Sequence, residues 1–257
     1  MNHLSAIVGP TKDDICRAPA RRDGRLCVSY PKSGRTWLRF ALWTAGIDAT
    51  LTHAGASTGW REIGRPYRAI PETLDQVPVV FLHRNPLDTA VSMFHQVHRR
   101  DLRRGSARWY RKLLPLALTS GLPPPDPDAF VLHPVYGVEN VCRYNRLWLD
   151  RLRGDRRSLI LTYEALRADP AEGFQRLLDH WGETGATGRD LAHAADMDRM
   201  RAAEQQGVAF LRINSARQAE PDSTKVRRGK VRGYAEELRP ETIAAARAIA
   251  ARYGFDA

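Results

Sequence analysis

Continuous apolar runs alternate along the chain with segments in which apolar residues recur at helical spacing. A strand covered on both faces of a parallel sheet has little polar alternation, so each run predicts a buried strand. Three such strands are predicted, at 26–30, 77–83 and 158–163. The segment 50–75 is rich in Gly, Thr and Arg and shows little periodicity, so no element is predicted there.

Helical spacing predicts the connecting helices. They lie at 37–46, 85–98, 138–153 and 170–181, with further helices near 187–204 and 240–253. Asn85 and Pro86 are expected to open the second of these, because Asn caps free backbone N–H groups and Pro fits the first turn. Prolines interrupt 105–134, which predicts a short helix followed by a mobile loop. Residues 1–24 have the pattern of an irregular leader.

The alternation of strands and helices predicts an α/β fold, with a central parallel β-sheet flanked by helices in one domain over 1–257. Ligands of such sheets bind at the carboxyl ends of the strands. The loop 31–36, Arg84 and Tyr163 occupy those ends. We therefore expect a ligand site where these three meet.

The net charge of the chain is +11 and its pI is near 10.0, which fits an anionic partner such as a nucleic acid. The basic residues, however, are 35 arginines and five lysines spread over the whole length. This distribution favours a compositional preference over a binding stripe, so no nucleic acid partner is expected. It also makes Lys32 conspicuous as one of few lysines.

No apolar stretch is long enough to span a bilayer, and the first residues lack a charged-then-apolar signal pattern. A cytoplasmic protein without a transmembrane segment is therefore expected. Cys16, Cys27 and Cys142 are odd in number and widely spaced, with no CxxC pair. They predict neither a disulfide framework nor a zinc site.

The stretch YPKSGRTW at 30–37 follows an apolar run and precedes a helical pattern. A loop in this place offers backbone N–H groups, a helix N-terminus and the hydroxyls of Ser33 and Thr36 to an anion. Lys32 adds a mobile positive charge, although it precedes the glycine and does not follow it as in the GxxxxGK[ST] nucleotide loop. The alternative is a tight strand-to-helix turn with a surface lysine.

The stretch RNPLDTAVS supplies a second set of polar groups, at the end of the next predicted strand. Arg84 and Ser92, two helical turns apart, could close on one anion from two sides, and arginine suits forked phosphate contacts. The alternative is a local ion pair between Arg84 and Asp88.

Together these segments resemble the sulfotransferases that use 3′-phosphoadenosine 5′-phosphosulfate (PAPS). The donor loop of that family has the form YPKSGTTW, close to YPKSGRTW here, and its 3′-phosphate segment RNPxDxxVSxxH is matched by RNPLDTAVSMFH at 84–95. RRGKVRGY at 227–234 resembles a third signature, RKG followed by a glycine and an aromatic residue. The resemblance spans about 26–235 in the family's order and implies a P-loop-like sulfotransferase fold.

Carried over position by position, the resemblance implies a donor site. Lys32 would contact the 5′-phosphate and the bridging oxygen, Trp37 would stack on adenine, and Tyr163 would meet the adenine edge. A weaker alignment places Met197 near the base, and Trp37 could equally be an ordinary core aromatic. The implied phosphate ligands are Ser33, Gly34, Arg35 and Thr36 at the 5′ end and Arg84, Ser92, Arg227, Arg228 and Gly229 at the 3′ end.

His53, in the stretch LTHAGAS, is the base for the acceptor hydroxyl that the resemblance implies, because the family's histidine lies between the donor loop and the RNP segment. Imidazole can accept a proton near neutral pH, although a lone histidine is more often structural. Leu51 stands where the family's KTH form has lysine. Arg35, which replaces a small hydroxylic residue, is one hypothetical source of the missing charge. Arg228 also replaces a lysine, and Tyr234 a tryptophan.

The expected reaction is an in-line sulfuryl transfer from PAPS to a hydroxyl, or less commonly an amine, that leaves the product PAP and needs no metal. Lys32 would stabilise the departing phosphate. The alternatives are a P-loop nucleotide kinase and a non-catalytic nucleotide or nucleic-acid binder. No acidic residue ends a predicted strand, as the magnesium site of a kinase would require, and this favours sulfuryl transfer.

The acceptor is a small molecule, carbohydrate or lipid that the sequence does not specify, and the oligomeric state cannot be read from it. Aromatic residues and prolines in 53–70 and 100–134 predict the walls of the acceptor site, with 105–134 as an acceptor-site loop. His95 and His98 have helical spacing but no apparent carboxylate or cysteine partner, so a surface or cleft-wall role is expected for both.

Overall fold

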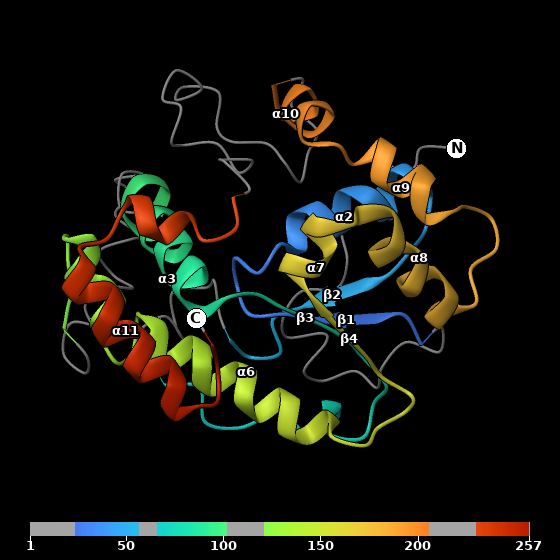
Figure 1. Ribbon diagram of the computed structural model, residues 1–257. Coiled ribbons are helices and arrows are strands. Elements are labelled where there is room, and N and C mark those ends of the chain that lie inside the picture. The colour runs from blue at the N-terminus through green and yellow to red at the C-terminus, as the bar shows by residue number, and fades with distance from the viewer. Residues whose placement is uncertain (1–23, 57–65, 102–120, 206–229, 257) are drawn as a thin grey trace.

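The computed structural model describes residues 24–56, 66–101, 121–205 and 230–256. Its sheet has four parallel strands in the order β2-β1-β3-β4, with helices on both faces (Figure 1). The strands are β1 (Leu26–Val28), β2 (Thr50–Thr52), β3 (Val80–His83) and β4 (Leu159–Thr162). The predicted α/β class and the three predicted strands are confirmed.

Strand β2 lies in the segment for which the sequence predicts no element. Among the described strands it is an edge strand of three residues that pairs with β1 alone, with Leu51 opposite Cys27. A strand of three residues is too short to show an alternation of apolar and polar positions, and it is recognised by its hydrogen bonds to the neighbouring strand. The sequence therefore could not reveal it.

Strand β4 ends one residue earlier than predicted. Tyr163 opens a helix, α7 (Tyr163–Ala168), because the Thr162 side chain accepts a hydrogen bond from the backbone N–H of Ala165 and caps it. Tyr163 nevertheless stays at the carboxyl end of the sheet. The prediction of a site there is unaffected.

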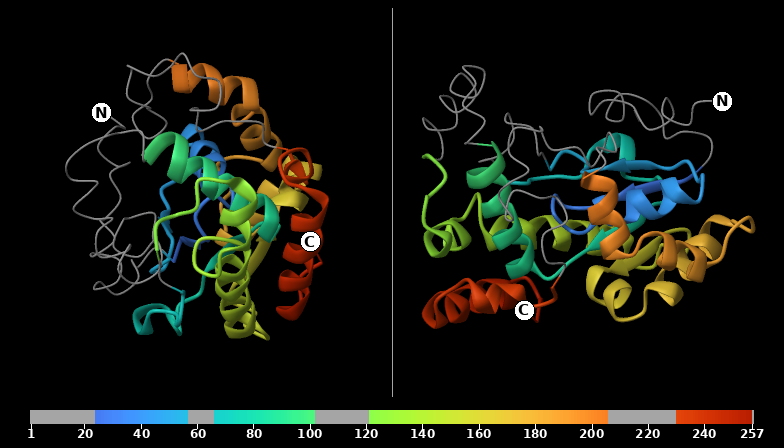
Figure 2. Two further views of the ribbon diagram at one scale, coloured as in Figure 1. Left: turned by 90° about the vertical axis from the view of Figure 1, so that its left-hand side faces the viewer. Right: turned by 90° about the horizontal axis from the view of Figure 1, so that it is seen from above.

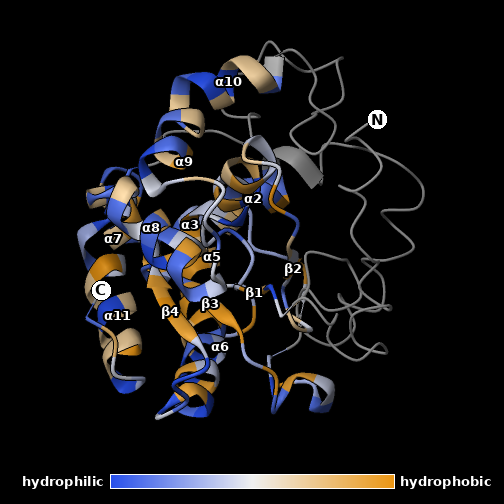
Figure 3. Cartoon of the chain, turned by 90° about the vertical axis from the view of Figure 1, so that its right-hand side faces the viewer, coloured by the Kyte–Doolittle hydropathy of each residue, from blue (hydrophilic) through white to orange (hydrophobic). Residues whose placement is uncertain are grey.

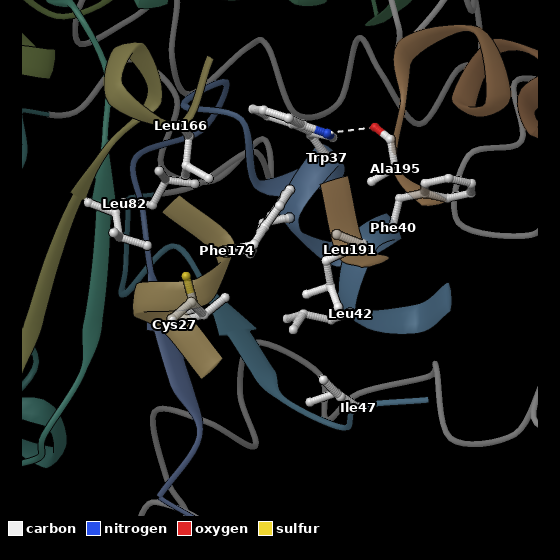
Figure 4. Packing of buried hydrophobic residues seen from close by; sticks show 14 of the residues in the cluster. Cys27, Trp37, Phe40, Leu42, Ile47, Leu82, Leu166, Phe174, Leu191 and Ala195 are labelled. Carbon is white, nitrogen blue, oxygen red and sulfur yellow. Dashed lines mark hydrogen bonds between the residues drawn. The ribbon is translucent and has the colours of Figure 1, made fainter. Parts of the chain in front are cut away.

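One face of the sheet is covered by α2 (Arg35–Thr44), α7, α8 (Pro170–Trp181) and α9 (Gly188–Ala194). Figure 4 shows their apolar side chains meeting those of the strands, with Leu42 near Leu191. Each fully buried large side chain of this kind stabilises the fold by about 1.5–3 kcal/mol. The single helix predicted near 187–204 is two helices, since α10 (Met197–Gln205) restarts after Asp196, whose carboxylate accepts from the Asp198 and Arg199 backbone.

The other face is covered by α3 (Pro86–His95), α5 (Pro127–Leu132) and α6 (Val138–Leu152). Phe81 of β3 stacks on Trp148 of α6 at a centroid distance of 5.9 Å. Asn85 accepts from the backbone N–H groups of Leu87 and Asp88, which confirms its predicted role as the cap of α3. A π-helical turn, Gln96–Asp101, continues this helix, and a short 3₁₀ turn, Glu72–Leu74, precedes β3.

A third apolar cluster joins the end of the chain to α3, α5 and α6. It includes the 3₁₀ turn Gly233–Glu236 and α11 (Pro240–Arg252), which Figures 1 and 2 show beside these helices. Figure 3 shows β3 and β4 in hydrophobic colours between helices with many hydrophilic positions. No helix in the described ranges has the length and apolar composition needed to cross a membrane.

Helix α5 corrects the expectation of an unstructured end to 105–134. It begins after Asp126, whose carboxylate accepts from the Ala129 N–H, and Pro127 occupies its first turn. The proline therefore begins a helix here, because it has no N–H to lose at that position. Residues 1–23 of the predicted leader (1–24) and the predicted helix near 105 lie outside the described residues.

Candidate active site

The loop between β1 and α2 has the backbone of an anion site. Gly34 at the start of α2 has φ 99°, and Lys32 takes φ 75°, a conformation that costs a non-glycine residue free energy. Within the described chain, no side chain caps α2 and no acidic residue lies in its first turn. The N–H groups at its N-terminus can therefore bind an anion.

The ring of Tyr163 lies where the three predicted strand ends meet. A Cβ atom added to Gly34 would lie 2.6 Å from Cδ2 of Tyr163, so the loop backbone touches the ring. The Arg84 guanidinium lies over the same ring at 4.5 Å, a cation–π contact. The fold therefore brings together the loop 31–36, Arg84 and Tyr163.

Arg84 is held by several groups at once. Its Nη1 lies 3.5 Å from the Lys32 carbonyl oxygen, and its Nη2 donates to the Lys230 carbonyl oxygen at 3.0 Å. Its ion pair with Asp88, the alternative reading from the sequence, is present at 3.5 Å. Within the described residues the buried Nε has no hydrogen-bond partner. One donor of the guanidinium is thus left for another group.

Other predicted phosphate ligands lie on the same loop and on α3. Ser33 is fully buried, and its Oγ has no hydrogen-bond partner in the described part of the chain. Ser92 lies one turn beyond Asp88 on the same side of α3, and Thr36 is partly buried in the first turn of α2. Arg227, Arg228 and Gly229 lie outside the described residues.

Trp37 is a buried core residue with 7% of its surface exposed. Its Nε1 donates to the Ala195 carbonyl oxygen at 2.8 Å, as Figure 4 shows, and its ring packs edge-on against Phe174. The ring also lies 5.9 Å from that of Tyr163, beside the site. Met197 is partly buried against the same cluster. Stacking of Trp37 on adenine stays a prediction.

His53 follows β2 and is buried. Its Nδ1 lies 2.7 Å from the Ser29 carbonyl oxygen, and because a carbonyl only accepts, Nδ1 carries the proton. In the neutral ring Nε2 therefore has the lone pair that a base needs. Tyr144 donates its hydroxyl to the His53 carbonyl oxygen at 3.2 Å, and Tyr67 donates to that of Ala54 at 2.9 Å. Tyr67, one of the predicted acceptor-site walls, is thus a buried residue that holds the backbone next to His53.

Two cations approach the site from the loop. Lys32 Nζ lies 3.4 Å from the Gln96 side-chain oxygen. Arg35 Nη1 donates to the Leu51 carbonyl oxygen at 3.2 Å, and among the described residues no carboxylate lies within ion-pair distance of it. Burial, together with the nearby charge of Arg39, lowers the pKa of Arg35 to about 10, so it stays protonated at neutral pH.

Three residues near the site make contacts that the sequence did not predict: Asp88 with the backbone of 232 and 234, Tyr144 with His53, and His83 with Phe81. Asp88 and Tyr144 hold distant segments through backbone groups, a kind of contact that leaves no sequence pattern. His83 ends β3 beside Arg84, stacked on Phe81, and burial lowers its pKa to about 4. It is therefore neutral at physiological pH and adds no second positive charge beside Arg84.

The expectation that His95 lacks a carboxylate partner is wrong, because its ring is buried and its Nε2 contacts the Glu237 carboxylate. The ring of His98 lies 4.8 Å from that of Phe94. In the ranges that the structure describes, no group of three or more His, Cys, Asp or Glu residues could hold a metal ion.

The family model of the sulfotransferase domain matches residues 65–252. The chain belongs to the sulfotransferase family. The match begins after the loop 31–36. The anion-binding geometry of that loop is therefore an observation independent of the family match. Among curated proteins, no sequence matches this sulfotransferase.

Solved structures share the fold of this sulfotransferase. The mouse sulfotransferase SULT7A1 complexed with PAP is 18% identical, with a TM-score of 0.60 over 94% of this chain and 87% of that one. A retinol dehydratase in complex with androsterone and the inactive cofactor PAP is 14% identical, with a TM-score of 0.56 over 99% and 85%. A retinol dehydratase in complex with retinol and PAP is also 14% identical, with a TM-score of 0.57 over 99% of this chain and 86% of that one. At these identities the likeness concerns the fold.

Proposed function

We propose that this sulfotransferase transfers a sulfuryl group from PAPS to a hydroxyl, or less commonly an amine, of an acceptor. The observation that carries the proposal is the meeting of the loop 31–36, Arg84 and Tyr163 at one end of the sheet. The structures of the mouse sulfotransferase and the retinol dehydratase contain PAP, which is PAPS without its sulfuryl group. They support the donor class.

The residues at the site suit a ligand with phosphates at both ends of a ribose. The buried Ser33 Oγ and Arg84 Nε have no partner among the described groups and can bind phosphate oxygens. The N–H groups at the N-terminus of α2, which no side chain of the described residues caps, favour the same charge. When bound, PAPS supplies the sulfuryl group and a phosphate as leaving group. We assign the 5′-phosphate to the loop 32–36, and the 3′-phosphate to Arg84 and Ser92 with 227–229.

Lys32 and His53 divide the chemistry between them. Lys32 contributes positive charge where negative charge develops on the bridging oxygen. His53 takes the acceptor proton at Nε2, and its Nδ1–H, bonded to the Ser29 carbonyl, holds the ring in the required tautomer. The two groups come from loops after adjacent strands, which suits attack and departure on opposite sides of one sulfur atom.

The acceptor site is proposed to lie between 53–70 and 105–134, beyond His53. The retinol dehydratase structures contain androsterone and retinol, both apolar molecules with a hydroxyl group. Such hydroxyl compounds are therefore the first acceptors to test here, ahead of carbohydrates and phenols. We also propose that 1–257 acts as a single domain without a resident metal.

The test is to incubate the purified protein with labelled PAPS and a panel of lipid, phenolic and carbohydrate hydroxyl compounds, and to detect the sulfated product by mass. Lys32→Ala and His53→Ala are expected to lower kcat at least about 100-fold, the usual size of an acid–base or charge contribution. His193→Ala is the control, because His193 is exposed on α9 and contacts Arg199.

Full activity of Lys32→Ala would overturn the assigned mechanism. ATP consumption that a magnesium chelator abolishes, without sulfated product, would favour the nucleotide kinase. PAP binding without any turnover would favour the non-catalytic binder.

A further inference from the structure

Asp88 connects two parts of the chain that are far apart in sequence. Its side chain is buried, with 3% of the residue exposed, in the first turn of α3. Oδ2 accepts from the Arg232 backbone N–H at 2.8 Å, and Oδ1 accepts from the Tyr234 N–H at 3.1 Å. Both carboxylate oxygens therefore bind a segment 144 to 146 residues later in the chain.

The segment that Asp88 holds is itself tightly turned. Arg232 has φ 59°, in the left-handed region, and directs its N–H at the carboxylate. The ring of Tyr234 is buried in the third apolar cluster, and its hydroxyl accepts from Arg247 at 3.0 Å. Backbone strain of this kind persists only when surrounding contacts fix it. Asp88 provides two of these contacts.

Arg84 belongs to the same arrangement. Its Nη2 lies 3.5 Å from Oδ2 of Asp88 and donates to the Lys230 carbonyl oxygen at 3.0 Å. Asp88 thus holds the guanidinium directly and also through the segment to which Lys230 belongs. We call Asp88, Arg84 and the backbone of 230–234 the Asp88 clamp.

We propose that Asp88 is a positioning residue for recognition of the donor's 3′-phosphate, because it fixes the direction of the Arg84 fork. This inference rests on the proposed function, which assigns the 3′-phosphate to Arg84. A carboxylate beside a phosphate site would ordinarily repel the ligand. Here each oxygen accepts a backbone N–H, and these hydrogen bonds stabilise the negative charge locally.

The test uses Asp88→Asn and measures affinity for two nucleotides, PAP and adenosine 5′-phosphate, which lacks the 3′-phosphate. An amide has one acceptor and one NH₂ group, so one backbone N–H would face another donor and the clamp would open. We expect PAP affinity to fall about tenfold, on the scale of one charge-assisted contact, and adenosine 5′-phosphate affinity to change less than twofold.

Asp128→Asn is the matched control. Asp128 is also buried, and it accepts from the backbone N–H and the Nε of Arg239, so it holds the start of α11 and not Arg84. Asp128→Asn should lower the melting temperature while leaving the ratio of the two affinities unchanged. In an Arg84→Ala background, Asp88→Asn should have little further effect on PAP affinity, because its action passes through Arg84.

An unchanged ratio of PAP to adenosine 5′-phosphate affinity in folded Asp88→Asn would refute the positioning role. Failure of the wild-type protein to bind PAP would instead refute the proposed function. If Asp88→Asn does not fold, Asp88→Glu replaces it, since the longer side chain keeps the charge but cannot keep both N–H contacts in place. The same selective loss of PAP affinity is then expected, and its absence contradicts the proposal.

Discussion

The loop 31–36 and the turn at His53 follow adjacent strands, but they are fixed in different ways. The loop is set largely by its own residues: positive φ at Lys32 and Gly34, and a helix that begins within it, at Arg35. The turn at His53 follows an edge strand of three residues and is held by Ser29, Tyr67 and Tyr144. The proposed donor loop can therefore be recognised from a short motif, whereas the place of the proposed base depends on distant contacts.

The largest effect is expected in the loop 31–36, whose conformation depends on its own residues. In Gly34→Ala the new Cβ would lie 2.6 Å from the Tyr163 ring at φ 99°, so both the backbone and the ring must shift. We expect a stability loss of about 2–4 kcal/mol from strain and overpacking together. PAP affinity should fall more than tenfold. Thermal unfolding and calorimetric titration with PAP measure the two effects.

Gly46→Ala separates backbone strain from the clash. Gly46 has φ 69°, but no heavy atom of the described structure lies within 4 Å of an added Cβ. It should cost only about 1–2 kcal/mol, the strain of one left-handed residue, and leave PAP affinity unchanged. If Gly34→Ala behaved like Gly46→Ala, the contact between the loop and Tyr163 would have no part in donor binding.

An intermediate effect is expected where the two regions meet, at Arg35. Arg35→Met removes a partly buried charge that has no carboxylate partner among the described residues and that contacts Leu51, two residues before His53. Desolvation of this charge opposes folding, so the variant should melt a few degrees higher. If Arg35 supplies charge at the reacting group, kcat should fall about tenfold.

Arg39→Met is the control for Arg35→Met, because Arg39 lies one turn along the same helix and burial also lowers its pKa. It should leave kcat unchanged. Equal kcat values for wild type and Arg35→Met would show that Arg35 does not supply charge at the reacting group.

The smallest effect is expected at the turn of His53, which is held by residues distant in sequence. Tyr144→Phe removes the hydroxyl that donates to the His53 carbonyl oxygen and should cost about 1 kcal/mol of stability, the usual net value of one hydrogen bond. We expect kcat to fall a few-fold while PAP affinity stays the same. Tyr253→Phe, which loses a hydrogen bond to Glu139 instead, should change stability only. A parallel loss of PAP affinity in Tyr144→Phe would show that the two regions are not independent.

The sequence predicted the elements whose signals are local. The apolar runs at β1, β3 and β4 and the cap at Asn85 are readable without a fold, because burial on both faces and capping depend on adjacent residues. The prolines near 127 led to the wrong prediction of a loop where α5 lies, because proline can end a helix or occupy its first turn. Strand β2 had no local signal at all.

The candidate site divides in the same way. The sequence placed the loop 31–36, Arg84 and Tyr163 at one edge, because parallel strands bring their carboxyl ends together. It treated Asp88 only as a neighbour of Arg84, whereas the fold adds two backbone donors from 232 and 234. It also left His53 without partners, although the Ser29 carbonyl oxygen and the Tyr144 hydroxyl, both distant in sequence, contact it.

For this sulfotransferase the sequence by itself determined the α/β order, the place of the proposed donor loop and the residue types that can bind phosphate. These properties follow from hydrophobic periodicity and from chemistry within a few neighbouring residues. Only the tertiary structure decided the tautomer of His53, the contact of Arg35 with Leu51 and the hold of Asp88 on the end of the chain. Such features depend on hydrogen bonds between backbone groups far apart in the chain, and every residue type carries those groups alike.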